Sequence, residues 1–383
     1  MHIAVKLTGL AVLAVVTGCS SLNPFASKTD SRNPPAALEE FQPTLTVNTA
    51  WTTSVGNAKR FAFTPAITSD SVFAAAADGT VTRIDAATGR SLWRINAEAR
   101  LTAGVGSDGA TVVVAAEKGV LMAFDGNGNL RWKEQASSEI LSAPAVGQGL
   151  VIVRSVDNRI AAYDAESGTR RWVAQRTSPP LTLRTAPGIA IAGSSAFVAL
   201  PGGRLIALAL SNGGARWEMA VGDPRGTTEL ERIADLSGTP VIVRGDVCAV
   251  AYQGRVACFD AASGAPRWAK DFSSDVGIGF DDRFVYAADE RGAVTAFARD
   301  TGSGIWRNNK LANRRLSAPV SAGRAVAVGD AKGYIHFLSR EDGSFVARVS
   351  TDGSPVIAAL PLVAGKSAIF QTQEGTLVAL ATE

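Results

Sequence analysis

Two glycine-rich segments have the letters of phosphate-binding loops, so their chemistry is considered first. Residues Gly104–Gly109 spell G-x-G-x-x-G, the pattern that holds a dinucleotide pyrophosphate at the start of a helix. The residues that follow, Ala110–Ala116, are rich in Val and Ala and predict a strand instead. Residues Gly365–Ser367 end like a P-loop, but Leu360 occupies the place of its first glycine. We therefore expect neither segment to bind a nucleotide.

Histidines and carboxylates give no catalytic arrangement either. The chain has two histidines, and His2 lies in the expected signal peptide, which leaves His336. One histidine cannot form a two-His metal site, no His-based triad can be assembled, and we expect His336 to be a packed strand residue. Four aspartates occupy one position of a repeated turn, which favours a structural role: Asp85, Asp125, Asp164 and Asp260. The sequence predicts no catalytic residue, no cofactor and no metal, so we do not expect an enzyme.

The N-terminal residues carry a different chemistry, that of lipid attachment. A basic start, Met1–Lys6, precedes an apolar run, Leu7–Val16, that is too short to cross a bilayer as a helix. The sequence Val-Thr-Gly-Cys then follows the pattern of a bacterial lipobox, with Cys19 as the acylated residue. We predict a lipoprotein signal peptide at residues 1–18, the alternative being a plain signal peptide with a chance cysteine. Acyl chains such as palmitate on Cys19 would anchor the mature protein to a membrane without spanning it.

Residues 19–45 are rich in Ser, Pro and Asn, which predicts a lipidated N-terminus and flexible tether with one short helix around Ala36–Phe41. Ser20 stands where an aspartate would retain an enterobacterial lipoprotein in the inner membrane, so we expect the outer membrane. Removal of the signal peptide takes away one lysine and no acidic residue, so the net charge of +3 falls by one. This balance gives no basis for nucleic-acid binding.

Two further cysteines, Cys248 and Cys258, flank a predicted hairpin turn near Gln253–Gly254 and can face each other across two strands. An oxidising compartment outside the cytoplasm would permit a disulfide between them. We favour a pair of buried free thiols over that disulfide.

A repeated unit dominates the rest of the chain. Its glycine position recurs eight times, at Gly79, Gly119, Asn158, Gly203, Gly254, Gly292, Gly333 and Gly375. Thirteen or fourteen residues after six of these positions comes a tryptophan, namely Trp93, Trp132, Trp172, Trp217, Trp268 and Trp306. The seventh copy has Ala347 at this place. The eighth would need its tryptophan beyond Glu383, and an orphan strand around Trp51 supplies it from the other end.

Each unit predicts four short strands. A proline opens the first strand, 14 residues before the repeat glycine in five copies, as at Pro65. A run rich in Val, Ala or Phe follows, such as Ser71–Ala77, and then the glycine strand and the tryptophan strand. The sequence therefore predicts an all-β, eight-bladed β-propeller of four-stranded antiparallel blades over residues 46–383. Its last blade is closed by the N-terminal strand around Trp51.

The repeat is lengthened at two consecutive places, and such insertions map to loops on one face of a propeller. From the tryptophan to the next strand-opening proline there are 12 or 13 residues at two other junctions. The distance is 15 residues from Trp172 to Pro187 and 23 residues from Trp217 to Pro240. The insertions hold apolar and charged residues typical of protein interfaces: Leu181, Leu183 and Arg184, then Glu229, Glu231, Arg232 and Asp235. The alternative is that the leucines fold inward to cover a blade edge.

These features together resemble a known family. The Asp-Ala-x-x-Gly-x-x-x-Trp turn is similar to the tryptophan-docking motif of PQQ-like repeats in quinoprotein dehydrogenases. The lipobox, the eight units, Leu181–Arg184 and Thr228–Asp235 together resemble the BamB family, the lipoprotein subunits of the bacterial outer-membrane β-barrel assembly machinery. The resemblance covers essentially the whole chain.

The resemblance implies a non-catalytic scaffold in the Bam complex, held at the outer membrane by lipid with its body in the periplasm. It would help outer-membrane proteins to fold and insert, and nascent outer-membrane proteins are a further expected partner. In that family, a Leu-Ser-Leu-Arg loop and an Asp-x-Asp pair contact the POTRA domains of BamA. The matching positions are Leu181, Leu183, Arg184 and Asp235, with Glu229, Glu231 and Arg232 as secondary candidates. Ser237 replaces the second aspartate, which removes one expected charge contact.

Two other classes of propeller compete with this interpretation. A quinone-dependent dehydrogenase would carry long insertions, an adjacent cysteine pair and a calcium site, and the sequence offers none of these. A peptidoglycan- or polysaccharide-binding propeller should expose aromatic platforms, whereas the tryptophans of this chain all serve the repeat.

Overall fold

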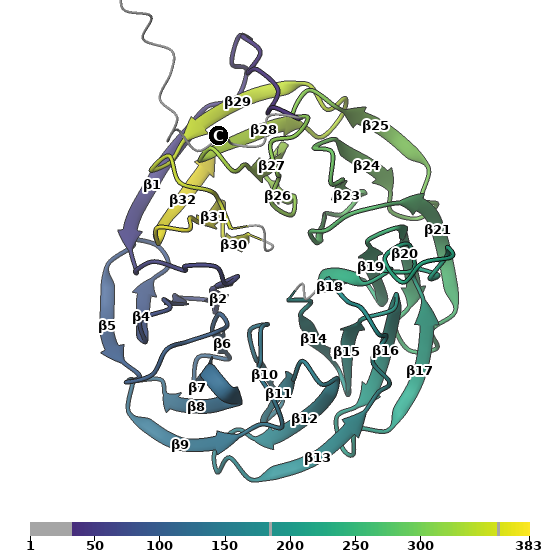
Figure 1. Ribbon diagram of the computed structural model, residues 1–383. Coiled ribbons are helices and arrows are strands. Elements are labelled where there is room, and N and C mark those ends of the chain that lie inside the picture. The colour runs from purple at the N-terminus through teal and green to yellow at the C-terminus, as the bar shows by residue number, and fades with distance from the viewer. Residues whose placement is uncertain (1–32, 184–185, 358–360) are drawn as a thin grey trace, which may run out of the picture. The chain divides into compact units, whose positions relative to one another are not determined.

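The strands follow the sequence repeat, four to each blade (Figure 1). The computed structural model describes residues 33–183, 186–357 and 361–383. Residues Pro35–Glu383 form one compact unit, to which the following description applies. Within it, eight four-stranded antiparallel sheets are arranged in a ring, with the first strand of each blade near the centre and the fourth at the rim (Figure 1). The predicted eight-bladed propeller is confirmed.

The first four blades succeed one another along the chain, each with its four strands in sequence order. Blade 1 has β2 (Ala66–Ile67), β3 (Ser71–Ala75), β4 (Thr80–Asp85) and β5 (Ser91–Asn96). Blade 2 has β6 (Gly106–Ser107), β7 (Thr111–Ala116), β8 (Val120–Asp125) and β9 (Leu130–Gln135). Blade 3 has β10 (Ala145–Gly147), β11 (Leu150–Arg154), β12 (Arg159–Asp164) and β13 (Arg170–Gln175). Blade 4 has β14 (Ile189–Ala192), β15 (Ser195–Leu200), β16 (Arg204–Ala209) and β17 (Ala215–Ala220).

The remaining blades continue in the same order. Blade 5 has β18 (Leu236–Val243), β19 (Asp246–Ala251), β20 (Gly254–Asp260) and β21 (Pro266–Phe272). Blade 6 has β22 (Ile278–Phe280), β23 (Phe284–Ala288), β24 (Val294–Ala298) and β25 (Gly304–Asn308). Blade 7 has β26 (Val320–Ala322), β27 (Ala325–Gly329), β28 (Tyr334–Ser339) and β29 (Phe345–Ser350). Blade 8 has β30 (Leu362–Ala364), β31 (Ser367–Gln371), β32 (Thr376–Thr382) and β1 (Val47–Ser54).

Helical structure in the described residues is limited to one 3₁₀ turn, η1 (Glu117–Gly119). None of the described helical segments has the length and apolarity that a membrane crossing requires. The second and third strands of the blades are largely buried, as in β3 and β4, because both of their faces pack against neighbouring blades. The apolar cores therefore lie between the blades.

Blade 8 closes the ring with strands from both ends of the chain. In Figure 1 the purple β1 lies beside the yellow β32, and the two pair antiparallel, with Trp51 opposite Ala379. Trp51 is buried, and its indole nitrogen donates a hydrogen bond to the carbonyl of Ala86 in blade 1 (3.0 Å). The expected closure around Trp51 is confirmed.

The repeated tryptophans join each blade to the next. Seven indole N–H groups donate to a backbone carbonyl in the turn between the third and fourth strands of the following blade, at 2.5 to 3.1 Å. At one such turn Gly213 has φ +70°, and a Cβ placed on it would lie 2.5 Å from the ring of Trp172. Only glycine accepts both the backbone conformation and the close contact. The turn aspartates serve the same local structure, as Asp164 Oδ1 accepts from the N–H groups of Glu166 and Ser167.

Ala347 takes the tryptophan position of blade 7, opposite Phe337 in β28. An indole at this position would have to dock on the turn between the third and fourth strands of blade 8. Those strands, β32 and β1, come from opposite ends of the chain, so no such turn joins them. The missing tryptophan therefore follows from the way in which the ring closes.

The segment before β1 lies along blade 7, where a tether with a short helix was expected. The N–H groups of Thr44 and Leu45 both donate to the carbonyl of Val346 in β29, at 3.0 and 3.2 Å, and Leu45 is buried. Phe41 stacks on Phe345 with ring centroids 5.5 Å apart. The predicted helix around Ala36–Phe41 is wrong, because these residues run without regular structure along the blade. The compact unit begins at Pro35, eleven residues before the expected boundary.

His336 is fully buried in β28, as expected of a packed strand residue, but it belongs to a polar cluster. Its Nε2 lies 2.9 Å from Asp330 Oδ2, which also accepts from Arg314 Nε (2.6 Å). Arg348 Nε donates to the other ring nitrogen (3.2 Å), so the histidine is held neutral with its proton on Nε2. Burial lowers the pKa of His336, against the pull of Asp330, and the two arginines lower it further. Arg314 also donates to the carbonyl of Ala36, which ties the cluster to the N-terminal segment.

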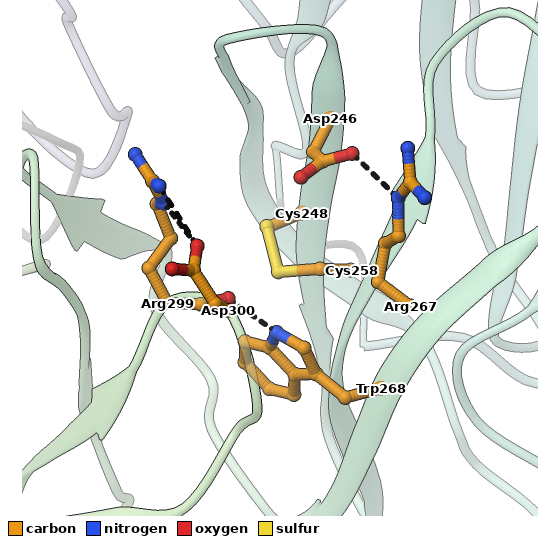
Figure 2. Close-up of a disulfide and its surroundings, with 7 residues drawn as sticks. All are labelled: Asp246, Cys248, Cys258, Arg267, Trp268, Arg299 and Asp300. Atoms are coloured by element: carbon orange, nitrogen blue, oxygen red, sulfur yellow. Dashed lines mark hydrogen bonds and ion pairs between the residues drawn. A yellow bond between two sulfur atoms is a disulfide. The ribbon is translucent and has the colours of Figure 1, made fainter.

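Cys248 and Cys258 form a disulfide, and our preference for free thiols is wrong. The two residues are direct partners in β19 and β20, with Cα atoms 4.1 Å apart, so their side chains meet on one face of the sheet. Figure 2 shows the bond beside Trp268, whose indole donates to the carbonyl of Arg299 in blade 6. The sequence indicated the strand pairing that makes the contact possible, but not the oxidation state.

Candidate functional site

The two lengthened connections lie on either side of blade 4. The first, residues 176–188 (with 184–185 outside the described residues), joins β13 to β14 and is called the 176–188 loop. The second joins β17 to β18 and is called the 221–235 loop. Neither loop contributes strands to a sheet in its described part, so side-chain hydrogen bonds to the backbone add to a few backbone–backbone bonds in holding its shape.

Asp235 links the two loops from a buried position. Its carboxylate accepts two backbone N–H groups, from Leu183 through Oδ2 (2.7 Å) and from Gly202 through Oδ1 (2.9 Å). Its own carbonyl accepts from the N–H of Tyr252 in the turn after β19 (2.8 Å). The side chain is only 3% exposed. Asp235 therefore positions Leu183 instead of presenting a charge to solvent.

The leucines of the 176–188 loop differ in exposure. Leu181 is 44% exposed, whereas Leu183 is partly buried beside its anchor Asp235. The inward folding considered as an alternative does not describe Leu181. Arg184 and Cys19, two of the expected functional residues, lie outside the described residues.

The acidic part of the 221–235 loop folds on itself. Glu231 Oε2 accepts from the N–H groups of Thr227 (2.8 Å) and Thr228 (3.1 Å), while Thr228 Oγ1 accepts from the N–H of Glu231, as in a capping box. These hydrogen bonds, from Thr228 first, lower the pKa of Glu231. Arg232 donates to the carbonyl of Gly226 (3.1 Å) and lies 3.6 Å from Glu229. All three charged side chains thus shape the turn.

The tip of this turn carries a residue that the sequence reasoning missed. Leu230 is 69% exposed, the highest value among the large apolar side chains described as exposed. An isolated leucine between two glutamates in a polar insertion was the available signal, because such a residue has no blade to pack against.

Ser237 is buried in β18, and its hydroxyl donates to the carbonyl of Ser274 (2.8 Å). A serine at this position makes a hydrogen bond to the connection between blades 5 and 6. The departure from the family's Asp-x-Asp pair is therefore accommodated inside the fold.

A pocket of about 180 Å³ lies between the loops and blade 3. Asp235 and Thr182 of the loops line it together with Arg154 and Val156 of blade 3. Arg154 is only 9% exposed, and burial lowers its pKa to about 10, partly offset by Asp235. The sequence analysis did not identify Arg154, although an arginine that ends a buried strand is itself a signal.

The glycine-rich segment Gly104–Gly109 lies at the start of blade 2. Residues Gly104–Gly109 lead into β6 and β7, not into a helix, and a Cβ on Gly104 would lie 2.1 Å from the carbonyl oxygen of Thr64. This glycine lets blades 1 and 2 approach. Among the described residues, no group of three or more His, Cys, Asp or Glu side chains is arranged to hold a metal ion.

Comparisons with known proteins agree on one family. The family model described as outer membrane protein assembly factor BamB matches residues 77–308 and 290–383. A protein of that name from Bordetella pertussis is 45% identical over 376 residues, covering 98% of this chain and 95% of its own. The Yersinia pestis protein of that name is 32% identical, covering 97% and 98%.

Solved structures extend the likeness to the fold. The crystal structure of BamB from Moraxella catarrhalis has a TM-score of 0.80 and 27% identity, covering 88% of this chain and all of that one. A quinohemoprotein alcohol dehydrogenase from Comamonas testosteroni has a TM-score of 0.69 at 14% identity, covering 88% and 76%, which shows a shared fold alone. The relatives that match in sequence are named as assembly factors and not as enzymes. This chain belongs to the BamB family of outer-membrane protein assembly factors.

Proposed function

We propose that this chain is a lipid-anchored, non-catalytic scaffold that docks on the POTRA domains of BamA and assists outer-membrane proteins to fold and insert. The observation that carries the proposal is the carboxylate of Asp235, which binds Leu183 N–H and so fixes one lengthened loop to the other. Two loops held in this way present their exposed residues in a fixed relation. A preformed surface loses less conformational entropy when a partner binds.

Leu181 and Leu230 are the apolar contacts of this docking surface. Both are large and exposed, and Leu230 lies between the charged residues Glu229 and Glu231. Apolar anchors within a polar rim carry most of the binding energy of protein interfaces. Arg184 remains a proposed contact from the sequence, and Glu229, Glu231 and Arg232 would act mainly by holding Leu230 in place.

The membrane anchor of the proposal is Cys19. Acylation at this residue would hold the propeller at the outer membrane on its periplasmic side. Replacement Cys19→Ser should abolish incorporation of labelled palmitate and move the protein from the membrane to the soluble periplasmic fraction. A Cys19→Ser protein that stays in the outer-membrane fraction with label attached would contradict the lipid anchor.

Affinity purification of the full-length chain with solubilised BamA tests the docking surface. Leu181→Ala, Leu183→Ala and Arg184→Glu should each reduce co-purified BamA at least tenfold. Leu92→Ala in β5 is a matched control, because Leu92 is 41% exposed and Leu181 is 44% exposed. Equal retention of BamA by the loop variants and the wild type would refute this site, and no retention by the wild type would refute the docking itself.

A further inference from the structure

Arg154 is a buried cation with an unused hydrogen-bond donor. It ends β11 with 9% of its surface exposed, and Nη1 donates to Asn158 Oδ1 (3.2 Å). Its Nε has no hydrogen-bond partner in the part of the chain that the structure describes. A buried, unsatisfied donor of this kind is costly to stability, because it has lost water without gaining a protein partner.

The pocket beside Arg154 has room for a hydrogen-bond acceptor. Arg154 lines it together with Thr182, Pro187, Pro201 and Asp235, in a volume of about 180 Å³. Cavities of about 150 Å³ are known to hold a benzene molecule, so this volume accepts one medium-sized side chain. The wall formed by Thr182 and Asp235 belongs to the two loops of the docking surface.

The lining selects a monoanionic acceptor. Arg154 offers a positive charge and a free N–H, which a carboxylate satisfies more strongly than a neutral carbonyl. The nearby carboxylate of Asp235 attracts Arg154, but each of its oxygens already accepts a backbone N–H. Among the described lining residues, one arginine, Arg154, would offset the repulsion that a dianionic phosphate meets from Asp235. An aspartate or glutamate side chain fits both the charge and the space.

We propose that this pocket receives a carboxylate side chain of the protein that docks on the two loops, and that Arg154 binds it. The inference rests on the proposed docking function and adds the chemistry of one contact. It also explains why the fold retains a buried arginine that the repeat does not use. The partner's carboxylate would accept the Arg154 Nε–H, which has no acceptor in the described part of the protein.

Binding of the full-length chain to the soluble POTRA region of BamA is the first measurement. Arg154→Met should weaken the affinity at least tenfold while the thermal midpoint stays equal or rises, since the change removes a buried charge. Arg154→Lys keeps the charge and should recover part of the affinity. Arg159→Met, at an exposed arginine at the start of β12, is the control and should bind like the wild type. Unchanged affinity of Arg154→Met would overturn the proposal while leaving the docking function intact.

Titration of the full-length chain with N-acetylglutamate amide, followed by NMR at arginine Nε–H, tests the pocket without any partner. We expect a saturable shift with this probe, none with N-acetylglutamine amide, and its loss in Arg154→Met. If wild type does not bind the POTRA region but responds to the glutamate probe, the docking function fails and the carboxylate pocket stands. If glutamate and glutamine give the same response, the pocket proposal is wrong whatever the partner does.

Discussion

The blade junctions and the two loops beside blade 4 use their side chains in opposite ways. At seven junctions an indole N–H meets a backbone carbonyl of the next blade, so the polar atom of the largest side chain is satisfied within the fold. In the loops, Leu181 and Leu230 face solvent, and the pocket between the loops and blade 3 holds an arginine with a free donor. The junctions thus use the polar atoms of their tryptophans within the fold, whereas the loops leave two leucines in solvent and border a pocket with a free donor.

The largest expected effect is on a junction. Trp172→Ala removes a buried ring and its hydrogen bond to the carbonyl of Leu210 (2.7 Å), and should lower the free energy of unfolding by about 4 kcal/mol. Urea unfolding of the two proteins, with equal slopes, measures the difference. A loss below about 1 kcal/mol would mean that the junctions do not carry the stability that their geometry indicates.

The second largest effect on stability should come from Asp235, which anchors the two loops. Asp235→Ala leaves the N–H groups of Leu183 and Gly202 without their acceptor, at a cost of about 3 kcal/mol, and should also lower affinity for BamA. Asp235→Asn keeps one acceptor oxygen and should lose less of both. If Asp235→Ala were as stable as the wild type, Asp235 would not be the buried anchor of the loops.

A smaller effect depends on pH. Burial, Arg314 and Arg348 keep the pKa of His336 below its usual 6.5, so the folded state binds its proton less readily than the unfolded state. The stability gained from the neutral ring is complete above pH 6.5 and is lost as pH falls below it, with a slope of at most about 1.4 kcal/mol per pH unit. The free energy of unfolding of the wild type and of His336→Gln, measured from about pH 4.5 to about pH 8, gives this slope. The same slope in both proteins would assign the acid sensitivity to other groups.

The smallest effect on stability should come from the loop tip. Leu230→Ala removes an exposed side chain that no blade covers, so the free energy of unfolding should change by less than about 0.5 kcal/mol. Affinity for BamA should fall at least fivefold in the same variant. Thermal unfolding and partner binding, measured on one preparation, separate the two readouts, and a loss in stability without a loss in affinity would assign Leu230 to the fold.

The fold was predictable because the same pattern of turn and strand residues recurs eight times along the chain. Glycine turns, tryptophan spacing and the orphan strand at Trp51 sufficed for eight blades and their closure. The position of the long loops was also readable, since a lengthened spacing shows where the repeat is interrupted. Two features could not be predicted because they depend on contacts between residues distant in sequence. They are the path of residues 36–45 along β29 and the burial of Asp235 against Leu183. No local pattern indicates whether a carboxylate will face solvent or a backbone N–H from another blade.

The pairing of β1 with β32 has a consequence for the order of events in folding. The side chain of Asn48 is hydrogen-bonded to that of Glu383, 335 positions away, so the eighth sheet cannot exist until the last strand has been made. Until then β1 has an unpaired edge, whose free backbone N–H and C=O groups can pair with a strand of another chain. Contacts of such high sequence separation form slowly. We therefore expect completion of the ring to be the final step of maturation, and the N-terminal strand to need protection during the interval.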